Sequence, residues 1–125
     1  STIEDYSRFA AMLINKGSFQ GRQILKPASV EYMTTHKLIA CQQEWFEKWW
    51  EMNGYSYGNL MRVMTDPWKA PFASGDGEYG WDGWLGCYFA NIPKENMTIL
   101  MMMQKKDAGT FDLTRKLRNV LLLGM

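Results

Sequence analysis

The side chains most often used in catalysis are scarce in this chain of 125 residues. His36 is the only histidine, so any Ser–His–Asp triad would have to use it. It follows the end of an expected helix, and we find no serine in the strand-turn-helix context of a nucleophile elbow. The chain also lacks a Ser-x-x-Lys sequence. We therefore interpret His36 as an exposed or capping residue and expect no catalytic nucleophile in this chain.

Two other spacings match catalytic or cofactor motifs only formally. Gly75-x-Gly77-x-x-Gly80 has the form of the dinucleotide fingerprint, but no expected strand precedes it and no helix follows. Tyr57-x-Asn59 has the form of a Tyr-x-Asn catalytic triplet, and it lies within a strand-like run. Neither spacing indicates a cofactor, and we expect none.

Composition and charge exclude several classes of protein. Fourteen basic and thirteen acidic residues give a net charge of +1, which does not attract nucleic acid or anionic lipid. The apolar runs are far shorter than a membrane span, and no signal peptide is visible, so the localisation stays open. Cys41 and Cys87 cannot build a disulfide framework and lack the spacing of metal ligands, so we expect no metal site.

The elements expected to position any site begin with helices. Three- and four-residue apolar spacing predicts a first helix that is capped by Ser1 or Thr2 and ends at Asn15-Lys16-Gly17. Residues 18–22 read as a tight turn, and a second, short helix has Pro27 in its first turn. The run 41–53 has paired aromatic residues at i,i+4 and predicts an amphipathic helix.

The second half of the chain predicts strands and one last helix. Strand-like runs cover residues 55–64, 79–83, 86–92 and 97–104, and the last is apolar enough to be a central strand. Thr110 can cap the final helix. Short loops imply antiparallel pairing. We predict one α+β domain over residues 1–125: an antiparallel sheet of three to four strands covered by helices, with the C-terminal helix packed on it.

Several segments, in order, resemble one known family. Residues 1–9, STIEDYSRF, are similar to the helix start S-T-x-x-D-Y-x-R-F, and residues 15–35 resemble the next segment, N-x-G…I-L-S-P-x-S-V-x-x-M-T-T. Tyr57-Gly58 looks like the Y-G-x-G-F strand, and residues 80–93 look like the third catalytic motif and the strand after it. The chain thus resembles the C-terminal half of the serine β-lactamase, penicillin-binding protein and esterase family.

This resemblance implies that the chain is the later part of a longer serine hydrolase. The family's Ser-x-x-Lys and Tyr-x-Asn motifs would lie before Ser1, which makes Tyr57-x-Asn59 a coincidence. The third motif maps to Trp81-Asp82-Gly83, and the N–H of Trp84 would donate to an oxyanion. An acidic side chain at Asp82 would repel a substrate carboxylate, so an ester, amide or peptide fits better than a β-lactam.

The expected partners follow from the same resemblance, and two other readings stay open. The chain would work with a missing N-terminal half or with a second copy of itself, and would bind a small molecule or peptide in the intact protein. Because the sheet would lack strands, we expect the isolated chain to self-associate. Alternatively, its six tryptophans and ten methionines could form a self-standing module that binds a ligand or a protein, or the chain could complete a sheet on another chain.

Overall fold

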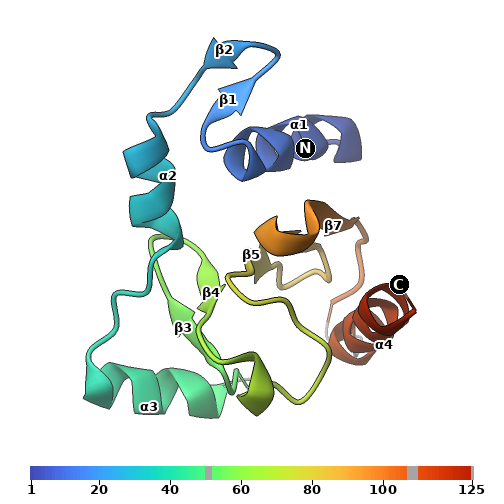
Figure 1. The fold of residues 1–125 in the computed structure, drawn as a ribbon. Coiled ribbons are helices and arrows are strands. Elements are labelled where there is room, and N and C mark those ends of the chain that lie inside the picture. The colour runs from blue at the N-terminus through green and yellow to red at the C-terminus, as the bar shows by residue number, and fades with distance from the viewer. Residues whose placement is uncertain (50–51, 107–109, 125) are drawn as a thin grey trace.

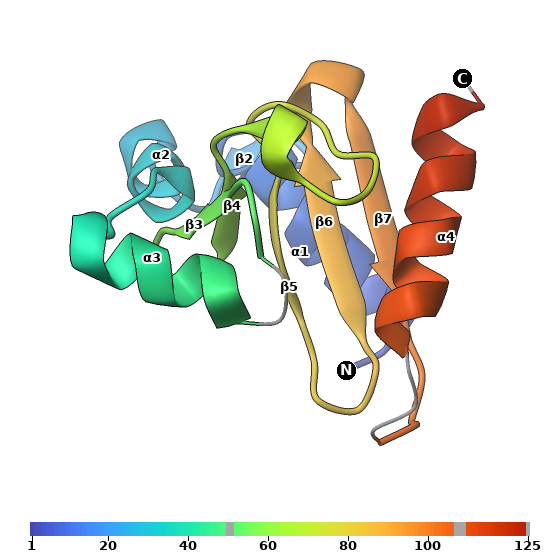
Figure 2. The ribbon, with the colours of Figure 1, turned by 90° about the horizontal axis from the view of Figure 1, so that it is seen from below.

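A five-stranded antiparallel sheet with a helix on each side organises the computed structural model of this chain (Figures 1 and 2). The structure describes residues 1–49, 52–106 and 110–124. The helices and strands in chain order are α1 (Ile3–Ile14), β1 (Ser18–Phe19), β2 (Arg22–Gln23), α2 (Pro27–Thr34), α3 (Ala40–Lys48), β3 (Tyr55–Tyr57), β4 (Arg62–Met64), β5 (Tyr79–Asp82), β6 (Tyr88–Ile92), β7 (Met97–Met101) and α4 (Thr110–Leu123).

The first helix begins and ends where the sequence predicts. The Asp5 N–H donates to Thr2 Oγ1 at 3.1 Å, so Thr2 is the cap. Gly17 ends the turn after the helix with φ +88°, and a Cβ there would lie 2.1 Å from the Leu25 carbonyl oxygen. Only glycine tolerates both the positive φ and this close approach. The expected tight turn at residues 18–22 is a hairpin that joins β1 to β2.

The sheet has one strand more than the predicted upper limit of four. Its order is β3-β4-β5-β6-β7, and every neighbouring pair is antiparallel. The expected single strand 55–64 is in fact a hairpin, because Leu60 adopts a left-handed φ of 64° and the Gly58 N–H turns back to the Met61 carbonyl. The prediction of a central strand at 97–104 is also wrong, since β7 lies at the edge of the sheet.

Apolar side chains cover both faces of the sheet. On one face, Leu13 of α1 packs in a cluster with Val63, Tyr79 and Phe89. On the other face, Leu117 of α4 packs on the cluster that includes Ile99. The predicted α+β class and the packing of the C-terminal helix on the sheet are therefore confirmed.

The third helix is shorter than predicted. The run 41–53 was expected to be helical, whereas α3 spans Ala40–Lys48, and residues 50–51 lie outside the described part of the chain. None of the helices in the described residues is long and apolar enough to cross a membrane.

Candidate functional site

The four residues singled out by the sequence lie at the end of β5 and in the turn after it. Trp81 and Asp82 are the last residues of the strand. The Gly83 N–H donates to the Cys87 carbonyl at 2.6 Å, so this residue still pairs toward β6. Trp84 lies in the turn and is exposed. The structure thus brings Trp81, Asp82 and Gly83 into one extended segment.

In the described part of the chain, the end of β5 pairs with no strand on the side away from β6, and we call this side its open edge. Strand β4 is in register with β5 only at Gly80 and Tyr79. Residues of antiparallel strands direct their backbone groups alternately to the two sides, and the Gly83–Cys87 bond fixes which residues bond to β6. The N–H and C=O of Asp82 therefore point to the side on which β4 has already ended. Gly80 is what lets β5 and β6 approach, because a Cβ there would lie 1.9 Å from the Phe89 carbonyl oxygen.

Four aromatic side chains gather beside this open edge, and we call them the aromatic wall: Phe46, Trp49, Tyr57 and Trp81. The rings of Trp81 and Tyr57 meet edge to face, with centroids 5.3 Å apart, and Trp49 lies 6.0 Å from Trp81. Since Tyr57 belongs to β3, the Trp81 ring reaches across the end of β4. It therefore lies on the same side of β5 as the Asp82 N–H.

The Asp82 carboxylate is paired with a buried arginine. Arg62 Nη1 lies 2.9 Å from Asp82 Oδ2, and the Asp82 side chain is 30% exposed while that of Arg62 is 2% exposed. The ion pair carries no net charge. Arg62 from the neighbouring strand β4 therefore balances the Asp82 charge, which weakens the repulsion of a substrate carboxylate that the sequence predicts.

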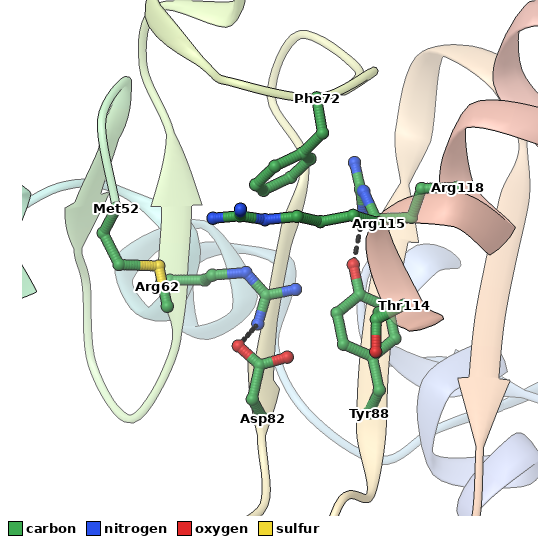
Figure 3. A pocket seen from close by; sticks show the side chains of 8 residues that line it. All are labelled: Met52, Arg62, Phe72, Asp82, Tyr88, Thr114, Arg115 and Arg118. Carbon is green, nitrogen blue, oxygen red and sulfur yellow. Dashed lines mark hydrogen bonds and ion pairs between the residues drawn. The ribbon is translucent and has the colours of Figure 1, made fainter. Parts of the chain in front are cut away.

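Glu78 is the centre of the network behind this pair (Figure 3 shows its outer members). Its carboxylate accepts the Tyr55 hydroxyl at 2.9 Å and both terminal nitrogens of Arg118, from Nη1 at 2.9 Å and from Nη2 at 2.5 Å. Arg118 also donates to the Ala73 carbonyl and to the Tyr88 hydroxyl. The network therefore joins α4 to β3, to the residue that precedes β5 and to β6.

Burial changes the proton affinities of the network. Desolvation raises the pKa of Asp82, although Arg62 opposes the rise. Desolvation also raises the pKa of Tyr55 well above its ordinary value, and Glu78 adds to this effect. Desolvation alone would lower the pKa of Arg62, but its anionic neighbours more than compensate and the net shift is upward. At neutral pH both tyrosines of the network are phenols and both arginines are cations.

A small hollow lies between this network and α4. It has a volume of about 10 Å³, which is the size of one water molecule and too small for an organic substrate. The residues that line it are Met52, Arg62, Phe72, Asp82, Tyr88, Thr114, Arg115 and Arg118 (Figure 3). This hollow is therefore not a substrate site.

Comparison with solved structures identifies the fold. Simvastatin synthase (LovD) from Aspergillus terreus superposes with a TM-score of 0.74 at 16% identity, over 95% of this chain and 32% of that protein. A second unliganded structure of the same enzyme gives a TM-score of 0.69 at 15% identity, with 95% and 33% coverage. The chain has part of a β-lactamase/transpeptidase-like fold.

Comparison of sequences finds relatives without an assigned activity. The proteins MT1414 and Rv1367c, from two strains of Mycobacterium tuberculosis, are each 32% identical over 110 residues. The match covers 83% of this chain and 27% of each relative, so the chain spans about a quarter of their length. No family model matches the chain.

The sequence reasoning missed the charged residues of the network. Arg62, Glu78 and Arg118 are among the most deeply buried side chains of the described residues. One signal was present, because Arg62 interrupts the apolar run Leu60-Met61-Arg62-Val63-Met64. A charge in such a strand indicates a buried partner. Nothing in the sequence identifies the partners of Arg62, which are Asp82 at 2.9 Å and Glu78 at 3.8 Å.

The sequence analysis also missed a Gly-x-Ser-x-Gly motif. Gly54-x-Ser56-x-Gly58 has the form of a nucleophile elbow. In the structure Ser56 is the middle residue of β3 and is buried, and its Oγ has no hydrogen-bond partner among the described residues. An elbow serine is exposed on a turn that leads into a helix, so Ser56 does not fit that role. His36 is exposed, and it does not hydrogen-bond to Ser56.

Proposed function

We propose that this chain forms part of a serine enzyme that transfers or hydrolyses acyl groups on an ester, an amide or a β-lactam. In this proposal the nucleophile comes from outside the chain, since no Ser-x-x-Lys is present in it. The open edge of β5 would form one wall of the cleft. The Trp84 N–H, in the turn after β5, would donate one of the two hydrogen bonds of the oxyanion hole.

One observation carries the proposal: among the described residues, no strand pairs with Asp82 on the side where β4 ends, within a fold that superposes on simvastatin synthase. A strand that pairs on both sides has no donor left for a ligand. The similarity covers the C-terminal part of that enzyme. This supports the proposal that an N-terminal part of a longer protein supplies the nucleophile. The aromatic wall beside the edge adds an apolar surface for the substrate.

The outer edge of β7 supports the proposal that a further strand pairs with this sheet. Because Met97, Ile99 and Met101 pair with β6, the backbone groups of Thr98 and Leu100 point away from the sheet. An edge with free N–H and C=O groups pairs readily with another strand. We propose that this strand comes from the remainder of a longer protein, or from a second copy when the chain is alone.

The activity test compares the chain with a longer gene product. The chain alone should hydrolyse neither a chromogenic cephalosporin nor p-nitrophenyl acetate. A longer protein with a Ser-x-x-Lys upstream should hydrolyse at least one of them, and a serine-directed inhibitor should abolish the reaction. Turnover by the purified chain itself, with the same inhibitor sensitivity, would contradict the proposal.

The backbone donor is tested by two substitutions at one position. Trp84→Pro removes the N–H, whereas Trp84→Phe keeps it and retains an aromatic ring. In the longer protein, Trp84→Pro should lower kcat by about 10²–10³, the usual cost of one oxyanion donor, and Trp84→Phe should stay near wild type. Equal activity of the two variants would exclude this N–H from the oxyanion hole.

The rival reading is a self-standing binding module. The exposed tryptophans Trp45, Trp68 and Trp84 are the observation that favours it, since large exposed aromatic side chains are common at interaction sites. The two readings differ in the longer protein. Specific ligand binding by the chain, together with no hydrolysis by any longer gene product, would support the module.

A further inference from the structure

Helix α3 is unusual because it carries large aromatic residues and buries none of its side chains. Trp45 on the helix is 76% exposed, and Trp49, which caps its C-terminal end, is 49% exposed. A surface helix normally buries an apolar stripe against the core. Exposed aromatic surface of this size on a small domain is typical of a binding site.

Specific contacts nevertheless fix α3 to the sheet. The Gln43 side-chain amide donates to the Tyr55 carbonyl at 2.7 Å and to Glu47 at 2.9 Å. The Phe46 ring lies 5.9 Å from the Tyr57 ring. These contacts hold the end of α3 beside β5, so Trp49 meets Trp81 while half of its surface stays exposed. The aromatic wall is therefore a preformed surface, and its member Phe46 also packs against the core cluster of Met52, Tyr55 and Met64.

Two described carboxylates near the wall are already paired. Asp82 pairs with Arg62 at 2.9 Å, and Glu44 pairs with Lys48 at 2.8 Å. A ligand carboxylate would have to displace one of these carboxylates to gain a cation. An uncharged group pays no such cost, and apolar carbon chains gain free energy when they cover aromatic rings.

We propose that the aromatic wall binds the apolar tail of an uncharged ester or amide whose carbonyl group binds at the end of β5. This inference rests on the proposed function and names its substrate class: neutral acyl compounds with a tail of several carbons. The carbonyl lies at the open edge of β5, and the tail crosses Trp81 toward Trp49. The carbonyl end of the ligand is thereby held by β5, and the tail by the aromatic rings of Trp81 and Trp49.

The test is a titration of the ¹⁵N-labelled chain, followed through its tryptophan indole N–H signals. Methyl hexanoate should shift the signals of Trp49 and Trp81 in a saturable way. The signal of Trp68, which is 96% exposed on the loop after β4, should not move. Methyl acetate, which lacks the tail, and sodium hexanoate, which carries a charge, should each bind at least about tenfold more weakly than methyl hexanoate.

Matched alanine variants locate the binding surface. Trp49→Ala should weaken the binding of methyl hexanoate at least fivefold, and the folded chain should persist because Trp49 is half-exposed. Trp68→Ala is the control and should bind like the wild type. The proposal is overturned if Trp49→Ala binds equally well, if all tryptophan signals shift alike, or if hexanoate binds as tightly as its methyl ester.

The outcomes separate this inference from the proposed function. Binding at Trp49 and Trp81 without hydrolysis by any longer protein would retain the ligand class and refute the acyl-transfer activity. Hydrolysis by the longer protein at a kcat/KM that does not depend on the length of the acyl chain, without shifts at the wall, would refute only the inference.

Discussion

Arg118 and Glu78 form a two-pronged ion pair in the interior, although they lie 40 residues apart in the sequence. Both terminal guanidinium nitrogens reach the carboxylate, at 2.9 and 2.5 Å, and the two side chains are 1% and 0% exposed. A carboxylate in this position is stable only because the arginine balances it. The pair therefore fixes α4 against the sheet.

Glu78→Gln should destabilise the chain strongly. The variant keeps the shape of the side chain but leaves the buried Arg118 without its counter-charge, at a cost of about 3–5 kcal/mol. Urea denaturation measures the loss. Glu44→Gln breaks an exposed ion pair and should keep the wild-type midpoint.

A double variant checks the cause of this loss. Glu78→Gln combined with Arg118→Met also removes the uncompensated charge, so it should recover part of the stability. A double variant less stable than the Glu78→Gln single variant would show that charge balance is not what holds α4.

Tyr55→Phe should change the alkaline stability. The folded pKa of Tyr55 is raised above 10.0, so the unfolded chain loses this proton first as the pH rises. The stability that Tyr55 contributes is thus complete below pH 10 and is lost as the pH rises toward its folded pKa. At pH 8 the variant should be about 1 kcal/mol less stable, because Glu78 loses a hydrogen bond.

The difference in free energy of unfolding between wild type and Tyr55→Phe should then fall above pH 10 by up to about 1.4 kcal/mol per pH unit, so it should vanish or change sign by pH 11. Urea denaturation at pH 8, 10 and 11 measures it. Tyr32→Phe, which removes an exposed phenol, is the matched control. A gap that stays constant or widens from pH 8 to 11 would contradict this explanation.

Asp82→Thr should improve the binding of carboxylate-bearing β-lactams relative to neutral esters in the longer protein. The substitution removes a carboxylate and releases the Arg62 guanidinium from its partner. We expect a relative gain of about 1–2 kcal/mol, because the contact is partly screened by solvent. Inhibition constants for the two substrate classes measure it.

The same measurement in an Arg62→Met background identifies the source of the gain. There, Asp82→Thr should give a smaller effect, since the released cation is absent. An unchanged ratio of the two substrate classes in the single variant would place Asp82 outside the substrate's reach.

The isolated chain should self-associate through β7. Sedimentation at micromolar concentration should show a dimer or larger species that buries at least about 1,000 Å². Thr98→Lys places a charge on the exposed edge and should shift the chain toward the monomer. Ser29→Lys on the exposed surface of α2 is the control. A wild-type monomer with a cooperative melt would show that the chain needs no further strand.

The sequence predicted the elements whose signals are local. Thr2 and Gly17 bound the first helix because a cap and a positive φ depend on adjacent residues. The hairpin at Leu60 was missed, since no Asn-Gly or Gly-Gly pair marks the turn and a leucine rarely adopts this conformation. The edge position of β7 was missed as well, because apolar residues reflect burial under helices and not only a central place in the sheet.

The strand position of the Trp81-Asp82-Gly83 segment was predictable from the sequence, whereas the electrostatics around Asp82 were not. Trp81-Asp82-Gly83 could be located by its resemblance to a known motif and lies on an open strand edge. The partner of Asp82 is Arg62, on another strand, and only the register of β4 against β5 brings the two together. Charge balance between strands is a property of the folded sheet.

The link between Glu78 and Arg118 also has a consequence for biosynthesis. Neighbouring strands in the sheet are consecutive in the sequence, so each hairpin can pair as soon as it leaves the ribosome. Glu78, however, emerges 40 residues before Arg118. Until α4 is synthesised, the nascent sheet would have to bury that carboxylate without its main cation. The last helix therefore sets the moment at which the whole domain can close, and partly made chains remain open.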